Sequence, residues 1–239
     1  MRLVFFTLLS TAGLRFGMAE EAAVPLPPAV YMGREIAQTM GYEGAPWLVR
    51  ESREREEHCD MLLKALRIKP GDTVCDMGCG NGFYAVKLAK LVGDNGKVVA
   101  VDIQPEMLSL LQERAKSEGF TNIGSVRGTV VDPNLADVSI DLMLLVDVYH
   151  EFSHPEQMLR AMRKSLKPTG RMVLVEFRAE DANVPIKPLH KMSKEQIMKE
   201  ILANGFKLVE QFDELPWQHV MFFMRDDAPA GDSTHSQRE

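Results

Sequence analysis

The chain has 239 residues, a formal net charge of −6 at pH 7 and 45% hydrophobic residues. This length and apolar content predict one globular domain with a sizeable core and short terminal extensions. The mild negative charge and the lack of a long Lys/Arg run argue against nucleic acid as a partner. Three cysteines are too few for a disulfide framework, and no His/Cys group has the spacing of a zinc site, so no metal is expected.

Residues 1–19 differ in composition from the rest of the chain. Met1 and Arg2 precede an apolar run, and small residues follow as far as Ala19. Two interpretations stay open: a signal peptide, or a misassigned start with Met18 as the first residue. The run is too short for a stable membrane span.

Residues 20–66 are expected to form an N-terminal helical lid over the ligand site. A short helical segment is predicted over residues 31–36. A second helix is predicted over residues 47–66, with a solvated, charged first half and a second half packed on the sheet. Tyr31, Trp47 and Arg50 are candidate substrate contacts. The alternative for the charges is a solvated face with pairs such as Arg50–Glu54.

Strand and helix patterns alternate after residue 67 and end in two strands. This order predicts an α/β fold, a doubly wound, mostly parallel sheet of seven strands with helices on both faces. The domain is expected over residues 67–225, followed by a polar, disordered tail over 226–239. Strands are expected at 73–76, 97–102, 123–127, 140–146, 171–177, 206–212 and 220–224, and helices at 82–92, 105–118, 155–166 and 194–203.

The first strand ends in a turn with glycine at every second position. Asp76 is followed by Gly78, Gly80 and Gly82, so the order is D-x-G-x-G-x-G, not the dinucleotide pattern G-x-G-x-x-G. Glycine lets the backbone approach a ligand and tolerates positive φ. A carboxylate is poorly suited to a pyrophosphate because like charges repel, but it suits an ammonium group. Cys79 is interpreted as a small spacer in this turn.

Asp102 ends the second strand at the interval expected for an acid that binds ribose. Its carboxylate can accept hydrogen bonds from both ribose hydroxyls, and Ile103 would then pack on the adenine. The alternative role for Asp102 is a helix N-cap before Pro105. A nucleoside is the common feature of dinucleotide and other nucleotide cofactors, so Asp102 does not discriminate between them.

Three segments resemble the class I S-adenosylmethionine-dependent methyltransferases. These are the turn at 76–82, which resembles motif I, the segment Leu144–Phe152, and the run Ser165–Leu174, which resembles the family's LkPgG turn. The resemblance implies a Rossmann-like fold with an antiparallel last strand and S-adenosylmethionine as the cofactor. It places Asp147 near the methionine half. The family often has an acid after the third strand for the adenine amino group, whereas this chain has Thr129, with Asp132 nearby.

The resemblance also implies methyl transfer to a small-molecule or lipid-like acceptor. His150 is the candidate base, since its ordinary pKa lies near neutral pH. Tyr149 is a candidate acceptor contact, and Glu176 is expected to close the acceptor pocket. A cytoplasmic location is favoured because the cofactor is cytosolic, with periplasmic or secreted locations open if residues 1–19 are a signal peptide. Two alternatives remain: a nicotinamide-dependent oxidoreductase, and a non-catalytic module that binds S-adenosylmethionine.

Overall fold

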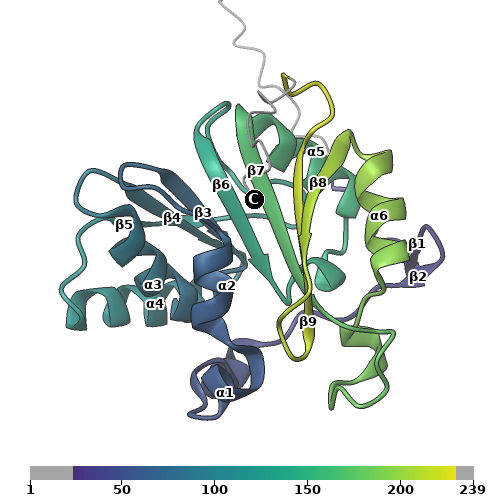
Figure 1. Cartoon of the computed structure of the whole chain (residues 1–239), viewed down its shortest axis with the longest axis horizontal. Coiled ribbons are helices and arrows are strands. Elements are labelled where there is room, and N and C mark those ends of the chain that lie inside the picture. The colour runs from purple at the N-terminus through teal and green to yellow at the C-terminus, as the bar shows by residue number, and fades with distance from the viewer. Residues whose placement is uncertain (1–23, 230–239) are drawn as a thin grey trace, which may run out of the picture.

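The computed structural model describes residues 24–229 as a seven-stranded sheet flanked by helices (Figure 1). The strand order is β5-β4-β3-β6-β7-β9-β8, and β9 runs antiparallel to both of its neighbours. This architecture confirms the predicted fold class. The strands are β3 (Thr73–Met77), β4 (Lys97–Asp102), β5 (Ile123–Arg127), β6 (Ile140–Val146), β7 (Leu166–Phe177), β8 (Phe206–Phe212) and β9 (Gln218–Arg225).

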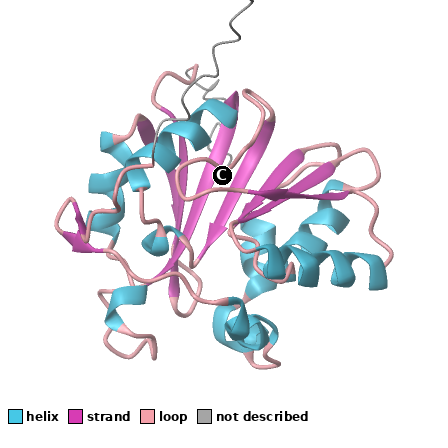
Figure 2. Cartoon of the chain, turned by 180° about the vertical axis from the view of Figure 1, so that it is seen from behind, coloured by secondary structure: helices cyan, strands magenta, loops and turns pink. Residues whose placement is uncertain are grey.

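Side chains of the central strands build an apolar core on each face of the sheet. In β6, Leu142 and Leu144 belong to one buried cluster, and Met143 and Leu145 belong to the other. This alternation is that of a strand buried on both faces. Figure 2 shows the sheet in magenta between the helices. One cluster includes residues of α2 (Cys59–Ala65), α3 (Phe83–Val92) and α4 (Pro105–Ser117), and the other includes residues of α5 (Pro155–Ser165) and α6 (Lys194–Ala203).

The direction of strand addition reverses at the centre of the sheet. From β3, the chain adds β4 and β5 on one side, then crosses to add β6 and β7 on the other. Such a switch point leaves a crevice at the carboxyl ends of the strands, where α/β proteins bind ligands. The topology therefore places the glycine turn after β3 and the segment after β6 side by side.

The helical segment predicted over residues 31–36 is wrong. The chain forms a small hairpin there, in which β1 (Val30–Tyr31) pairs antiparallel with β2 (Arg34–Glu35). The two turn residues, Met32 and Gly33, have φ angles of 50° and 97°. Positive φ at both positions is the mark of a type I′ turn, which matches the twist of a hairpin.

The single helix predicted over residues 47–66 is also wrong. The chain forms a 3₁₀ helix η1 (Tyr42–Val49), a short helix α1 (Arg53–Glu57) and then α2, with a break at His58, whose φ is 49°. The solvated face is correct for Glu51, Glu54 and Arg55, which are exposed, but not for Arg53 and Glu57, which are only 5% and 2% exposed. Arg50 does not pair with Glu54, and its guanidinium instead lies 2.6 Å from the carboxylate of Glu57.

The predictions for residues 1–19 lie outside the described part of the chain. Of the predicted tail, residues 226–229 are described, and Asp226 accepts a hydrogen bond from Arg163. No helix within residues 24–229 has the length and apolar character needed to cross a membrane.

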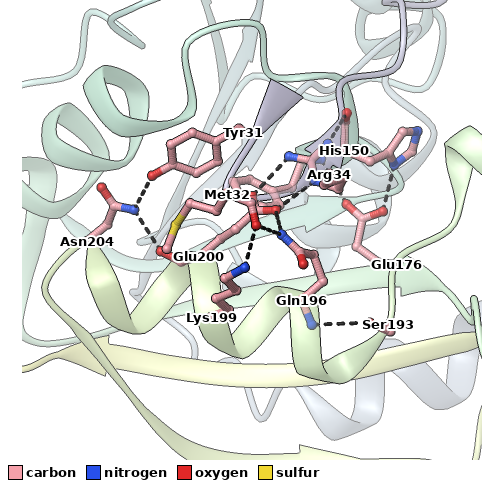
Figure 3. Close-up of polar contacts among 11 residues, drawn as sticks. Tyr31, Met32, Arg34, His150, Glu176, Ser193, Gln196, Lys199, Glu200 and Asn204 are labelled. Atoms are coloured by element: carbon pink, nitrogen blue, oxygen red, sulfur yellow. Dashed lines mark hydrogen bonds and ion pairs between the residues drawn. The ribbon is translucent and has the colours of Figure 1, made fainter. Parts of the chain in front are cut away.

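A buried ion pair attaches the N-terminal hairpin to the domain (Figure 3). Glu200 of α6 is fully buried and accepts hydrogen bonds from Arg34 Nε at 2.8 Å and Nη2 at 3.0 Å. The Tyr149 hydroxyl also donates to Glu200, at 2.7 Å. Arg34 Nη1 donates to the main-chain oxygen of His150 at 2.9 Å. The hairpin is thereby tied to the segment that follows β6.

Removing one charge of the Arg34–Glu200 pair should lower the free energy of unfolding more than removing both charges. Glu200→Gln leaves the buried Arg34 guanidinium without a counter-charge, and we expect a loss of about 3–5 kcal/mol in the free energy of unfolding. Arg34→Met combined with Glu200→Gln removes both charges and should lower the free energy of unfolding less than Glu200→Gln alone. Urea unfolding of the two variants measures the difference. An equal loss in both would show that Arg34 and Glu200 are not energetically coupled.

Candidate active site

A cavity of about 430 Å³ opens at the carboxyl ends of β3, β4 and β6. This volume lies in the range of roughly 300–1,000 Å³ that is usual for small-molecule sites. Three parts of the chain line it: the N-terminal segment between residues 39 and 57, the strand ends with the turns that follow them, and residues 185–190. The predicted N-terminal lid thus contributes Trp47 and Arg50 to the lining.

Two glycines of the turn after β3 lie against the cavity where a side chain cannot fit. Gly78 has a φ of 70°, and a Cβ there would lie 2.3 Å from Val148 Cγ2. Gly80 has a φ of 51°, and its Cβ would lie 2.6 Å from Leu48 Cδ1. Both residues need glycine for the positive φ and for the close approach.

The other members of the turn support it from behind and do not line the cavity. Gly82, with a φ of 82°, precedes α3 and packs against Leu111. Cys79 is buried, and burial raises the pKa of its thiol well above the usual range. This environment agrees with the interpretation of Cys79 as a spacer, since a reactive cysteine needs a lowered pKa.

Asp102 is held in place by main-chain donors. Its Oδ2 accepts from Gly80 N at 3.0 Å, and its Oδ1 accepts from Gln104 N at 2.9 Å. The N-cap of α4 is Gln104, so the N-cap alternative for Asp102 is wrong. Burial raises the pKa of Asp102. Each carboxylate oxygen keeps a lone pair for a ligand, and Ile103 lines the cavity beside it.

The loop after β5 is closed by its own hydrogen bonds. Thr129 lines the cavity, and its Oγ1 accepts from Asp132 N at 2.9 Å. Asp132 does not line the cavity, and its Oδ1 accepts from Asn134 N at 2.7 Å. Thr129 therefore lies nearer to a ligand than Asp132 does.

Two buried carboxylates near the glycine turn are incompletely satisfied. Among the described residues, Asp76 Oδ2 and Asp147 Oδ1 have no hydrogen-bond partner. Burial and the neighbouring Asp102 carboxylate raise the pKa of Asp76 to about 7. Burial and the carboxylate of Glu57 raise the pKa of Asp147 well above its usual range. Orphaned buried acceptors of this kind are the partners that a bound cation would satisfy.

The N-terminal segment brings a buried charged pair, Arg53 and Glu57, to the cavity. Arg53 Nε lies 2.9 Å from Glu57 Oε2, its Nη1 donates to Leu48 O at 2.8 Å, and both charged residues line the cavity. Arg53 and Glu57 were not predicted as site residues, because a dense run of charges usually marks a solvated face. Their spacing of four residues beside Trp47 was the only signal.

His150 lies in a chain of polar groups that ends in the cavity. Its Nδ1 lies 2.7 Å from Glu176 Oε2, drawn in Figure 3, and its Nε2 lies 3.0 Å from His190 Nδ1. Burial lowers the pKa of His150, but the Glu176 carboxylate more than offsets this, and the net pKa is raised. Glu176 also accepts from Tyr149 N at 2.9 Å. The carboxylate therefore fixes the orientation of the imidazole.

Three candidate substrate residues do not line the cavity. Tyr149 is fully buried with its hydroxyl on Glu200, and the Tyr31 hydroxyl accepts from Asn204 at 2.8 Å. Glu176 is also fully buried and reaches the cavity only through His150. These positions do not support direct substrate contacts by the three side chains.

The chain matches a family model described as a methyltransferase domain over residues 68–223. It is 33% identical over 113 residues to a ubiquinone/menaquinone biosynthesis C-methyltransferase of Teredinibacter turnerae, an alignment that covers 46% of this chain and 45% of the relative. It is 27% identical over 149 residues to a demethylmenaquinone methyltransferase of Lactobacillus johnsonii, with 62% and 59% covered. The chain thus spans about half the length of the curated relatives it matches.

Among solved structures, an S-adenosylmethionine-dependent methyltransferase from Aquifex aeolicus superposes with a TM-score of 0.74 at 24% identity, over 78% of this chain and 100% of that one. This likeness shows the fold. The cofactor that the family implies is S-adenosylmethionine. Because the family model covers well over half of its residues, the chain belongs to the methyltransferase-domain family.

Proposed function

We propose that this chain transfers a methyl group from S-adenosylmethionine to a small-molecule or lipid-like acceptor that carries an acidic hydroxyl. The observation that carries the proposal is one cavity lined by two chemically different groups of residues. Asp102, Gly80 and Ile103 form one group, and His150, which is held by the buried Glu176, belongs to the other. A nucleoside site next to a histidine–carboxylate pair is what such a reaction requires.

The residues present fit this cofactor. Asp102 is fixed by two main-chain donors and would hold the ribose hydroxyls, while Gly78 and Gly80 leave room for the nucleoside. Asp147 lines the cavity, and its unsatisfied oxygen would accept from the ammonium group; Asp76 lies behind the lining at the end of β3 and would add negative charge there, while Arg53 supplies a cation for the carboxylate. When bound, the cofactor supplies a sulfonium methyl that is already activated, so the protein contributes mainly orientation.

Apolar side chains and His150 form the acceptor end. Phe152, Met158 and Phe177 line the cavity there. The names of the curated relatives favour a quinol-type aromatic ring as the acceptor, whose hydroxyl is acidic enough to lose its proton to an oriented imidazole. The exposed Trp47, with Arg50 stacked 3.8 Å from its ring centre, offers a flat surface at the same cavity.

The alternatives are less compatible with these residues. A dinucleotide pyrophosphate would face the carboxylates of Asp76, Asp102 and Asp147, which lie together near the glycine turn. A non-catalytic module would not need a histidine oriented by a buried carboxylate in its cavity.

Ligand stabilisation distinguishes the candidates. S-adenosylhomocysteine should raise the thermal unfolding midpoint by mass action, whereas NAD should not. Asp102→Ala should weaken S-adenosylhomocysteine binding by about tenfold or more, because a hydrogen bond to a charged group contributes roughly 1.5–3 kcal/mol. Stabilisation by NAD alone would refute the proposal, and unchanged affinity in a folded Asp102→Ala protein would refute the ribose assignment.

Asp76→Asn should change stability and cofactor binding in opposite directions. With a folded-state pKa of about 7, native Asp76 binds more protons than the unfolded chain between about pH 4 and 7, so stability falls as the pH rises through this window. At pH 8 and without ligand, Asp76→Asn should therefore be more stable than the parent protein. The difference should be up to about 4 kcal/mol, because the pKa of Asp76 is shifted by about three units. Its affinity for S-adenosylhomocysteine should fall, because a negative partner of the ammonium is lost.

Urea unfolding at pH 5 and pH 8, together with calorimetric titration, measures both effects of Asp76→Asn. Asp94→Asn, in the exposed turn after α3, serves as the control. It should change neither the free energy of unfolding nor the affinity for S-adenosylhomocysteine. A variant that is less stable than the parent protein at pH 8 would contradict the prediction.

His150→Ala should separate turnover from cofactor binding. Loss of a positioned acid–base group should lower turnover by roughly 10²–10⁴-fold, while S-adenosylhomocysteine binds as before, since Asp102 and the glycine turn are untouched. The readout is transfer of labelled methyl to a panel of quinol-type acceptors. If His150→Ala kept its turnover, His150 would have only a packing role.

A further inference from the structure

Three residues at the acceptor end of the cavity form a cluster that acid–base chemistry by His150 alone does not explain. His150, Glu151 and His190 each offer one ligand atom, and these atoms all lie within 4.8 Å of one another. All three residues line the cavity. They belong to the 3₁₀ helices η2 (Tyr149–Glu151) and η3 (Pro188–His190), which contact each other across a separation of 40 residues.

The distances between the three atoms suit one metal ion. His150 Nε2 lies 3.0 Å from His190 Nδ1, and Glu151 Oε1 lies 3.9 Å from each of these nitrogens. The centre of a triangle with these sides is about 2.1 Å from every corner, and zinc binds imidazole nitrogen and carboxylate oxygen at about 2.0–2.2 Å. An ion at this point would lie in the plane of the three atoms, and side-chain adjustments of a few tenths of an ångström would bring them toward the tetrahedral arrangement that zinc prefers.

The surroundings of His150 are those of a metal ligand. Its Nδ1 lies 2.7 Å from the fully buried Glu176 carboxylate, so Nδ1 carries the proton and Nε2 presents its lone pair to the cavity. Ligating histidines usually donate their other ring N–H to a carboxylate or carbonyl in this way, which fixes the tautomer and raises ligand basicity. Replacement of the hydrogen bond between the two imidazoles by an ion needs only a change of tautomer at His190.

We propose that His150, Glu151 and His190 bind a divalent transition-metal ion, with Zn²⁺ as the best-matched species, whose open positions take the hydroxyl oxygen of the acceptor. Two imidazoles and one carboxylate with a free position are the ligand set of catalytic zinc sites, and imidazole donors select against Mg²⁺. The cavity beside the cluster leaves space for that fourth ligand. This inference rests on the proposed function and names the group that activates its acceptor.

The chemistry balances without any further reactant. With the ion bound, His150 acts as a ligand and the ion takes over activation of the acceptor: the hydroxyl bound to the ion has a lowered pKa and releases its proton to the solvent. The electron pair of the resulting anion, at oxygen or at the conjugated ring carbon, forms the bond to the methyl carbon. The carbon–sulfur bond breaks and its pair stays on sulfur, which leaves a neutral thioether.

Calorimetric titration of the chelator-treated full-length protein with Zn²⁺ tests the site, with Mg²⁺ as the comparison ion. We expect one Zn²⁺ per chain and much weaker binding of Mg²⁺. His190→Ala and Glu151→Gln should each lower zinc affinity by at least about 100-fold, and Glu176→Gln, which acts through His150, by about 10–100-fold. Co²⁺ in place of Zn²⁺ should give a visible absorption band that His190→Ala abolishes.

His58→Asn is the matched control. It removes a histidine that does not line the cavity, at a left-handed position that asparagine tolerates, and should leave zinc affinity unchanged. Absence of saturable zinc binding, or equal affinity in the parent protein, His190→Ala and Glu151→Gln, would overturn the proposal. S-adenosylhomocysteine binding to the zinc-free protein is measured in parallel, so that the metal site can fail while the methyltransferase proposal stands.

Discussion

Three buried carboxylates at one edge of the sheet set the main constraint on this molecule. Asp76 and Asp102 are buried at the carboxyl ends of β3 and β4, and Asp147, whose Oδ1 is buried, follows the neighbouring β6, so the topology brings three carboxylates to the same edge of the sheet. Buried like charges raise one another's pKa and cost stability unless a cation or donor compensates them. The ligand-free domain therefore carries an unfavourable arrangement that a ligand with an ammonium group and ribose hydroxyls would relieve.

The N-terminal segment supplies part of the compensation. Arg53 lies buried beside Glu57 and close enough to Asp147 to offset part of the rise in the pKa of that carboxyl, and Arg50 pairs with Glu57 as well. The segment is joined to the domain by polar contacts, including Asn81 to Ala45 O and Gln104 to Met40 O. These hydrogen bonds hold the N-terminal segment in position beside the cavity.

The fold could be predicted because hydrophobic periodicity and turn residues agree along residues 67–225. The glycine turn and Asp102 were found for a similar reason: their roles follow from local backbone geometry and from a fixed interval along the chain. The secondary structure of residues 31–57 was predicted wrongly, because contacts with residues far along the chain, such as Arg34 to Glu200, help to hold the hairpin at Met32–Gly33. His190 could not be assigned to the site from the sequence, because nothing local to it specifies that η3 packs against η2.

The contacts that anchor the hairpin bear on the order in which parts of the protein fold during synthesis. Arg34 leaves the ribosome early, but its partners lie 116 and 166 residues further along the chain. Contacts between such distant segments form late, since the loop-closure entropy must be overcome before they stabilise anything. The contacts of Met40 and Arg53 involve residues up to Glu151, so this part of the wall can form before α6 is made, whereas the hairpin at Arg34 can be locked in place only after Glu200 has emerged. During synthesis the five parallel strands β3 to β7 are therefore made while the hairpin still lacks its partner on α6, and β8 and β9 join the sheet after that.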